Sequence, residues 1–114
     1  MVHEMKLNNG PFAAIKSGTK TIEMRLWDEK RRLLSPGDKI VFTNRTTGET
    51  ISTKIIGLHI FESFDELYKH FDKISLGYDA QETALPSDME EYYSKDEQAQ
   101  YGVVGIEINT LENL

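Results

Sequence analysis

The sequence predicts an α+β fold, a small mixed β-barrel of about five or six strands with flanking helices. Several short segments alternate apolar and polar residues and are separated by turn residues, which is typical of antiparallel strands. Two capping-box patterns mark the starts of helices late in the chain. A β-branched segment near the end supplies a strand that can close the barrel. An open α+β sheet is the alternative architecture.

The predicted order is strand, helix, three strands, two helices and a final strand. After a first strand, residues 8–18 predict a short helix, with Pro11 at its first position and Gly18 in the left-handed position beyond its end. Lys20–Leu26 is the second strand. Residues 27–40 predict a polar turn or one helical turn that is broken by a Pro-Gly dipeptide.

Two more strands follow in residues 38–45 and 51–61, joined by the turn sequence TTGET. In the second of them one side is polar at the start, whereas the far end is apolar on both sides and is expected to be buried on both. The final strand covers residues 101–111, where alternate Val and Ile residues share one face.

Two helices are predicted between these strands. Ser63 and Glu66 form the first capping box, and apolar residues then recur with helical spacing along one stripe. Ser87 and Glu90 form the second capping box, which predicts one helix through residues 89–101.

The chain has 114 residues, which favours a single domain over residues 1–114. It contains no cysteine, so disulfides and thiolate metal sites are excluded and a reducing, cytoplasmic location is expected. The start lacks the apolar run of a signal peptide, and no apolar stretch approaches the ~20 residues that span a bilayer. We expect no membrane association, no cofactor and no metal, with a monomer as the default state.

The net charge of −6 argues against bulk attraction to nucleic acid, but the charge is unevenly distributed. Residues 1–57 hold ten Lys and Arg against six Asp and Glu, a balance of +4. Residues 58–114 hold three against thirteen, a balance of −10. The basic first half can form a local positive surface, although a solvated acidic surface is the plainer interpretation.

The segment GTKTIEMRL, residues 18–26, concentrates charges in a predicted strand. Strand alternation places Glu23, Arg25 and Trp27 on the face opposite the apolar residues. Lys20 lies at the mouth of the strand, where its stem can cover apolar surface while its ammonium reaches a cleft. These side chains either cover a wet face or line a pocket.

In a pocket these residue types suit recognition or hydrolysis. A partly desolvated Lys20 can act as a base or nucleophile with Glu23 as its partner, and Arg25 can bind a phosphate or carbonyl with its bidentate fork. Trp27 either stacks on a base or covers one end of the barrel. Further cations can extend a phosphate-binding rim: Lys16, Lys30, Arg31 and Arg32.

Three patterns in the same order resemble the ASCH domain family of the PUA-like superfamily over nearly the whole chain. They are G-x-K-T-x-E-x-R over residues 18–25, P-G-D-x-I over residues 36–40, and the sequence YYS followed by YGVVGIEI. The resemblance implies a PUA-like β-barrel with a cleft beside the helices. It also implies RNA or modified nucleosides as ligands.

One branch of small ASCH proteins is a set of amidohydrolases that remove the acetyl group from N4-acetylcytidine. Their motif is similar, G-x-K-T-I-T-x-R, so Lys20 matches their lysine and Glu23 stands where they have threonine. The branch also uses a later glutamate, for which this chain offers several candidates: Glu62, Glu66, Glu82, Glu90 and Glu91.

Three functions therefore stay open. The first is an RNA- or modified-nucleoside-binding module with a basic cleft around Lys20, Glu23 and Arg25. The second is an amidohydrolase acting on N4-acetylcytidine-like nucleosides, with Lys20 and Glu23 as its catalytic pair. The third is the binding of another small metabolite in the same pocket.

Overall fold

The computed structural model describes residues 1–111 of the chain. Its elements are β1 (Val2–Leu7), α1 (Asn9–Ser17), β2 (Ile22–Leu26), the 3-10 helix η1 (Arg31–Leu33), β3 (Lys39–Asn44), β4 (Thr50–Phe61), α2 (Phe64–His70), the 3-10 helix η2 (Pro86–Glu91), α3 (Lys95–Tyr101) and β5 (Val103–Thr110). The predicted order of strands and helices is confirmed, although the second strand begins at Ile22 rather than at Lys20. Among these residues no helix is long and apolar enough to cross a membrane.

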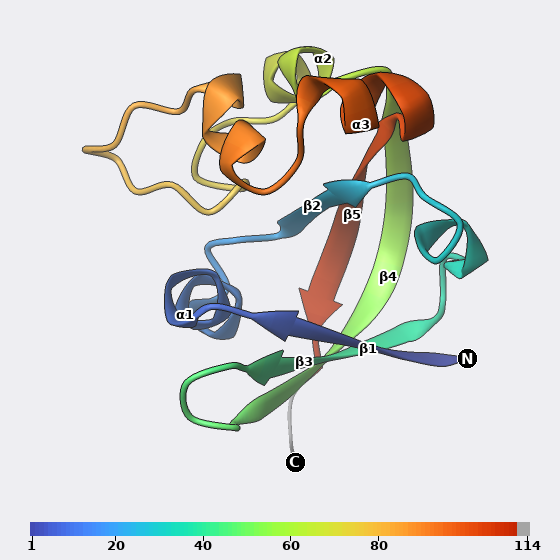
Figure 1. Ribbon diagram of the computed structural model, residues 1–114. Coiled ribbons are helices and arrows are strands. Elements are labelled where there is room, and N and C mark those ends of the chain that lie inside the picture. The colour runs from blue at the N-terminus through green and yellow to red at the C-terminus, as the bar shows by residue number, and fades with distance from the viewer. Residues whose placement is uncertain (112–114) are drawn as a thin grey trace.

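The five strands form one sheet in the order β1-β3-β4-β5-β2. β1 runs parallel to β3, and the other neighbouring pairs are antiparallel. β1 and β2 are therefore the two edge strands. The sheet curls into a half-barrel that is open between these edges (Figure 1). The predicted small mixed barrel with flanking helices is confirmed in the form of this half-barrel, and within residues 1–111 no backbone ladder closes it between these edges.

β2 is buried along both of its faces. Its Ile22, Met24 and Leu26 pack in an apolar cluster with residues of α2 and η2, among them Leu67 and Met89. A second apolar cluster joins β1, α1, β3, β4 and β5. The apolar face predicted for this strand is therefore confirmed, and the opposite face is left for the charged residues.

The far end of β4 differs from its prediction, because Ile56 and Ile60 are 43% and 52% exposed. A bulge between Ile55 and Gly57 shifts the pairing with β5. A bulge adds a residue to one strand, so the regular alternation of inward and outward side chains breaks at that point. The expectation of burial on both sides was wrong for this reason.

The helix predicted over residues 89–101 is two shorter elements. η2 ends at Glu91, and α3 begins after Ser94. Ser94 Oγ accepts a hydrogen bond from the backbone N–H of Glu97 at 3.1 Å, and the Glu97 carboxylate accepts one from the Ser94 N–H at 3.0 Å. The capping box of this helix is therefore Ser94–Glu97 rather than Ser87–Glu90.

Other helix ends follow the sequence more closely. α2 begins after Ser63, whose Oγ accepts from the backbone N–H of Glu66 at 3.4 Å. Gly18 ends α1 in the left-handed region, with φ of 87°, where glycine is strongly preferred. α1 starts at Asn9, so Pro11 stands at its third position rather than its first.

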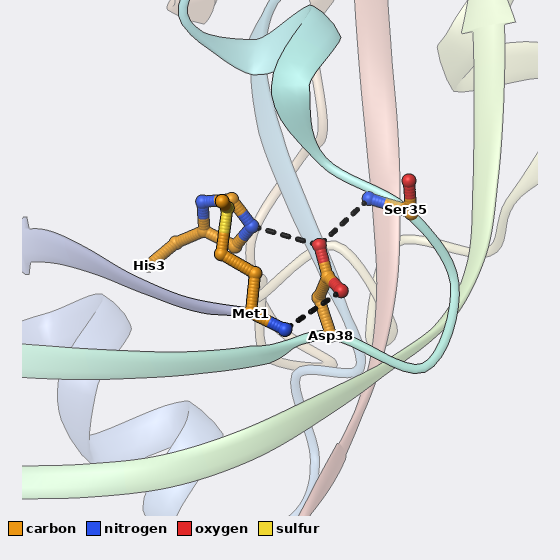
Figure 2. A network of polar contacts seen from close by, with 4 residues as sticks. All are labelled: Met1, His3, Ser35 and Asp38. Carbon is orange, nitrogen blue, oxygen red and sulfur yellow. Dashed lines mark hydrogen bonds and ion pairs between the residues drawn. The ribbon is translucent and has the colours of Figure 1, made fainter.

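Asp38 anchors the start of the parallel pairing between β1 and β3 (Figure 2). Its Oδ2 accepts from the backbone N–H of Ser35 at 3.1 Å and lies 2.8 Å from His3 Nε2. Its Oδ1 lies 3.3 Å from the amine of Met1. The hydrogen bond with His3 is the main reason why the pKa of Asp38 lies below its ordinary value. These contacts tie the first strand to the turn that precedes β3.

The position of the cap on α3 can be tested by replacing serines. Ser94→Ala should lower the free energy of unfolding by about 1 kcal/mol, because it removes the acceptor for a backbone N–H in the first turn of α3. Ser87→Ala is the matched control, since Ser87 lies inside η2 rather than at a helix cap, and its cost should stay under about 0.5 kcal/mol. Urea unfolding measures both values, and equal losses would contradict this assignment of the cap.

Candidate functional site

A cavity of about 800 Å³ lies where the sheet is open between its edge strands. One wall comes from the end of β1 and the start of α1, and the back wall comes from β2. The opposite wall comes from the loop within residues 74–82 and from the end of η2 through Tyr93. In Figure 1 the segments that supply these two walls, α1 with the end of β1 and the loop before η2, lie below and above β2.

Glu23 is the centre of the back wall, and only 5% of its side chain is exposed. Its Oε1 lies 3.2 Å from Lys20 Nζ. Its Oε2 accepts from Arg25 Nε at 2.9 Å and lies 2.8 Å from Arg25 Nη2. Strand alternation puts Glu23 and Arg25 on the same face of β2, so the guanidinium reaches the carboxylate of its neighbour. We call Lys20, Glu23 and Arg25 the charged triad.

Lys20 was expected at the mouth of the strand but is buried, with 7% of its side chain exposed. The loop that contains Leu76 and Gly77 covers its stem, and its ammonium donates to the carbonyl of Leu76 at 3.2 Å. Gly77 has φ of +108°, and a Cβ there would come within 3.0 Å of Lys20 Cδ. Glycine at this position therefore permits the positive φ and leaves room for the stem of Lys20.

Arg25 connects the two edges of the open sheet. Besides its contacts with Glu23, its Nη2 donates to the backbone carbonyl of Lys6 in β1 at 3.1 Å. Because the described sheet has no backbone ladder between β1 and β2, this side-chain hydrogen bond spans the gap between them. The back wall and the β1 wall of the cavity are thus held together by one guanidinium.

Within the triad, Glu23 and its cationic partners favour each other's charged forms. Burial alone would raise the pKa of the Glu23 carboxyl, but Lys20 and Arg25 outweigh burial and hold that pKa below its ordinary value. Burial would lower the pKa of Arg25, but Glu23 reverses this effect and the pKa is raised. Burial also raises the pKa of the Tyr93 hydroxyl, against the opposing effect of Arg25. Glu23 is therefore a carboxylate at neutral pH, beside a protonated tyrosine.

The opposite wall carries a chain of hydroxyl groups that ends on a carboxylate. Tyr78 donates to Asp88 Oδ2 at 2.8 Å, and its hydroxyl lies 2.7 Å from that of Tyr68. Burial, together with the hydrogen bonds to Tyr68 and Asp88, raises the pKa of Tyr78. The hydroxyl of Tyr78 therefore stays protonated and is oriented by its two partners.

The sequence predicted a basic cleft, but the cavity contains both basic and acidic residues. Its basic residues come from the early strands and the segments that follow them: Lys6, Lys20, Arg25 and Arg45. Its acidic residues, apart from the glutamate of the triad, come from the opposite wall: Asp79, Glu82, Asp88 and Glu91. The cavity therefore has a cationic side and an anionic side.

Of the residues proposed from the sequence, the structure brings together the charged triad and places the other cations elsewhere. Lys16 is exposed and pairs with Glu49. Arg31 Nη1 lies 3.7 Å from Asp28 Oδ2. Lys30 is exposed and, like Lys16 and Arg31, does not line the cavity.

Trp27 and Arg32 lie in a second cleft, next to the end of β4, α2 and α3. Arg32 donates to the carbonyl of Trp27 at 2.8 Å and to that of Tyr101 at 3.3 Å, and its guanidinium carbon lies 5.7 Å from the centre of the indole. Trp27 also packs, partly buried, against the larger apolar cluster. This placement favours the interpretation of Trp27 as a cover over the core.

Two of the late glutamates left open by the sequence line the cavity, namely Glu82 and Glu91. The other three line the second cleft: Glu62, Glu66 and Glu90. Sequence reasoning missed Lys6 and Arg45, because only the parallel pairing of β1 with β3 brings these two positions to one wall. Within residues 1–111 no group of three or more His, Asp or Glu side chains is placed to hold a metal ion.

Glu23→Gln should destabilise the protein at neutral pH by about 3 kcal/mol, because the buried Lys20 and the partly buried Arg25 lose their carboxylate. The pKa of Glu23 is lowered in the folded protein, so its contribution is complete above the ordinary value of 4.5. The contribution is lost as pH falls through the lower folded value. Urea unfolding at a series of pH values should therefore show the gap between the parent and the variant closing below about pH 4.5.

The matched control for this prediction is Glu49→Gln, which removes the partner of the exposed Lys16. An exposed pair contributes little, so this variant should lose under about 1 kcal/mol. A gap for Glu23→Gln that stays constant down to low pH would contradict the electrostatic role of the carboxylate.

The family model described as the ASCH domain matches residues 5–112 of the chain. The crystal structure of the hypothetical protein PH0355 is similar, with 31% sequence identity and a TM-score of 0.82, over 97% of this chain and 100% of that one. The solution NMR structure of the protein PF0455 from Pyrococcus furiosus is 32% identical with a TM-score of 0.71, over 99% of this chain and 100% of that one. No curated protein matches the chain significantly.

The family match includes the charged triad, the two edge strands apart from the first residues of β1, and the helices that border the cavity. The resemblance drawn from the three sequence patterns is therefore confirmed at the level of the family. The chain belongs to the ASCH domain family, which is generally linked to RNA binding.

Proposed function

We propose that the protein binds RNA or a modified nucleoside, with one base inserted into the cavity against the charged triad. The observation that carries this proposal is the convergence of two buried charges and one partly buried charge on one wall of a cavity of about 800 Å³. That volume lies within the range of about 300–1,000 Å³ that is typical of small-molecule sites. The link of the family to RNA supports the same class of ligand.

The triad offers hydrogen-bonding groups of both kinds. The ammonium of Lys20 has three N–H donors, and its contacts with Glu23 and Leu76 use two of them. A carboxylate has about four acceptor sites, so Glu23 keeps capacity beyond its contacts with the two cations. A partner with acceptors and donors side by side on one edge would satisfy both groups, and the edge of a nucleobase has this character.

Aromatic side chains at the end of η2 supply a surface for stacking. Tyr92 lines the cavity and is 57% exposed, and the ring centres of Tyr92 and Tyr93 lie 6.5 Å apart. Stacking of an unpaired base on an exposed aromatic ring contributes about 1–3 kcal/mol in single-strand recognition. The exposure of Tyr92 therefore supports a ligand with a planar face.

The electrostatics of Glu23 favour binding over proton transfer. A general base works best when its pKa lies near the working pH. Two cations hold the pKa of Glu23 below its ordinary value, which makes the carboxylate a weak base. The same pairing makes it a fixed hydrogen-bond acceptor, which suits recognition.

Lys20→Met should weaken the binding of the preferred ribonucleoside at least about tenfold, because it removes a charged donor and keeps an unbranched stem. Isothermal titration with the standard ribonucleosides and N4-acetylcytidine measures the loss. Lys16→Met removes an exposed lysine that does not line the cavity and should bind like the parent. Thermal melting of both variants shows that they are folded. If Lys20→Met melts and binds like the parent, the triad is not part of the binding site.

Amide hydrolysis is a second candidate function, and the contact of 3.2 Å between Lys20 Nζ and Glu23 Oε1 is the observation that favours it. In this scheme one member of the pair would activate water and the other would protonate the leaving amine. Binding of another small metabolite is a third candidate, and it would be supported if ribonucleosides fail to bind while other polar ligands raise the melting temperature.

Incubation with N4-acetylcytidine, followed by chromatography for cytidine, separates binding from hydrolysis. Because Glu23 is held as a paired carboxylate, we expect the nucleoside to be recovered unchanged. Formation of cytidine by the parent, lost in Lys20→Met and kept in Lys16→Met, would establish hydrolysis instead.

A further inference from the structure

We propose that Lys6 and Arg45 form a phosphate subsite at the mouth of the cavity, so that the ligand is a nucleotide rather than a free nucleoside. This inference rests on the proposed function, because it adds a subsite for phosphate to the base site at the charged triad. The observation that carries it is a pair of cations that line the cavity, one near the end of β1 and one directly after β3.

The two residues are brought together by the parallel pairing of β1 with β3. In this register Lys6 is opposite Thr43 and Leu7 is opposite Asn44. Arg45 follows directly, and its backbone N–H donates to the carbonyl of Leu7 at 2.9 Å. Lys6, near the end of β1, and Arg45, directly after β3, therefore lie on the same wall of the cavity.

Neither cation is neutralised by the rest of the described protein. Within residues 1–111 the side chains of Lys6 and Arg45 make no ion pair within 4.0 Å and no hydrogen bond. The other cations that line the cavity, Lys20 and Arg25, both contact Glu23. A lysine and an arginine that line the same cavity without a carboxylate partner are suited to hold a phosphate.

The acidic residues decide on which side of the cavity a phosphate can lie. The opposite wall carries Asp79, Glu82, Asp88 and Glu91, which repel an anion. Among the cations that line the cavity in the described residues, only Lys6 and Arg45, on the wall of β1 and β3, have no carboxylate partner within 4.0 Å. A nucleotide with its base at the triad therefore has its phosphate directed toward Lys6 and Arg45.

The base site and the phosphate subsite are adjacent in the structure. Arg25 of the triad donates to the backbone carbonyl of Lys6 at 3.1 Å, so a direct hydrogen bond joins the two sites. Gly10, at the start of α1, also lines the cavity, and a Cβ at that position would meet no atom within 4 Å. The lining of the cavity thus has open space at the start of α1.

The phosphate could belong to a free mononucleotide or to a nucleotide within a single-stranded RNA. Titrations should compare the standard ribonucleosides and N4-acetylcytidine with their 5′-monophosphates and with a short single-stranded RNA of the preferred base. The test variant is Lys6→Ala/Arg45→Ala. The matched control is Lys39→Ala/Lys54→Ala, which removes two exposed cations that are opposite each other on β3 and β4 and do not line the cavity.

We expect the parent to bind the monophosphate at least about tenfold more tightly than the nucleoside. The test variant should bind both ligands with the affinity of the parent for the nucleoside, and the salt dependence of phosphate binding should largely disappear. The control variant should keep the preference for the monophosphate. Tighter binding of RNA than of the monophosphate, lost in the test variant, would support RNA as the source, and the reverse order would support a free nucleotide.

Equal affinities of the parent for nucleoside and monophosphate would overturn the subsite while leaving the base site intact. A test variant that keeps the preference of the parent would overturn the assignment to Lys6 and Arg45. Failure of the parent to bind any of these ligands would refute the proposed function as well. The two failures are distinguished in the parent itself, because failure of the subsite alone leaves binding of the nucleoside intact.

Discussion

The buried carboxylate of Glu23 is the group on which the open side of the sheet depends. A carboxylate out of contact with water is tolerated only when cations and donors surround it. Lys20 and Arg25 supply them at 3.2 and 2.8 Å. Each cation also holds a second element, since Lys20 donates to the carbonyl of Leu76 and Arg25 to that of Lys6. One carboxylate thus connects β2 to the loop over the cavity and, across the gap, to β1.

The gap follows from the strand order, which leaves β1 and β2 as edges. Exposed edges invite pairing with other chains, and inward-pointing charges together with a covering loop are common protections. Both protections are present on β2, where the carbonyl of Ser75 accepts from the backbone N–H groups of Thr21 and Ile22 at 3.0 Å. Since side chains and a loop, rather than a neighbouring strand, complete this edge, the space that a closed barrel would fill becomes a cavity.

The uneven charge of the sequence is turned by the fold into a polarity across the cavity. The net charge is −6, yet the early strands bring several cations to one side. The acidic second half of the chain supplies the carboxylates of the opposite wall. A local arrangement of this kind, rather than net charge, governs how an anionic ligand is oriented at close range. An acidic protein can therefore suit a phosphate-bearing partner at one defined place.

The sequence by itself determined the order of the elements, the two faces of β2 and the helix ends at Gly18 and Ser63, because alternation, capping and left-handed glycine act within a few residues. It also pointed to Lys20, Glu23 and Arg25 as candidate site residues, since they stand close together in the chain, just before and within β2. Only the tertiary structure decided that Lys20 is buried beneath the loop at Gly77. The convergence of Lys6 with Arg45, and the placement of other predicted cations away from the cavity, were decided in the same way. These features depend on pairing between segments far apart in the chain, and no local pattern records that pairing.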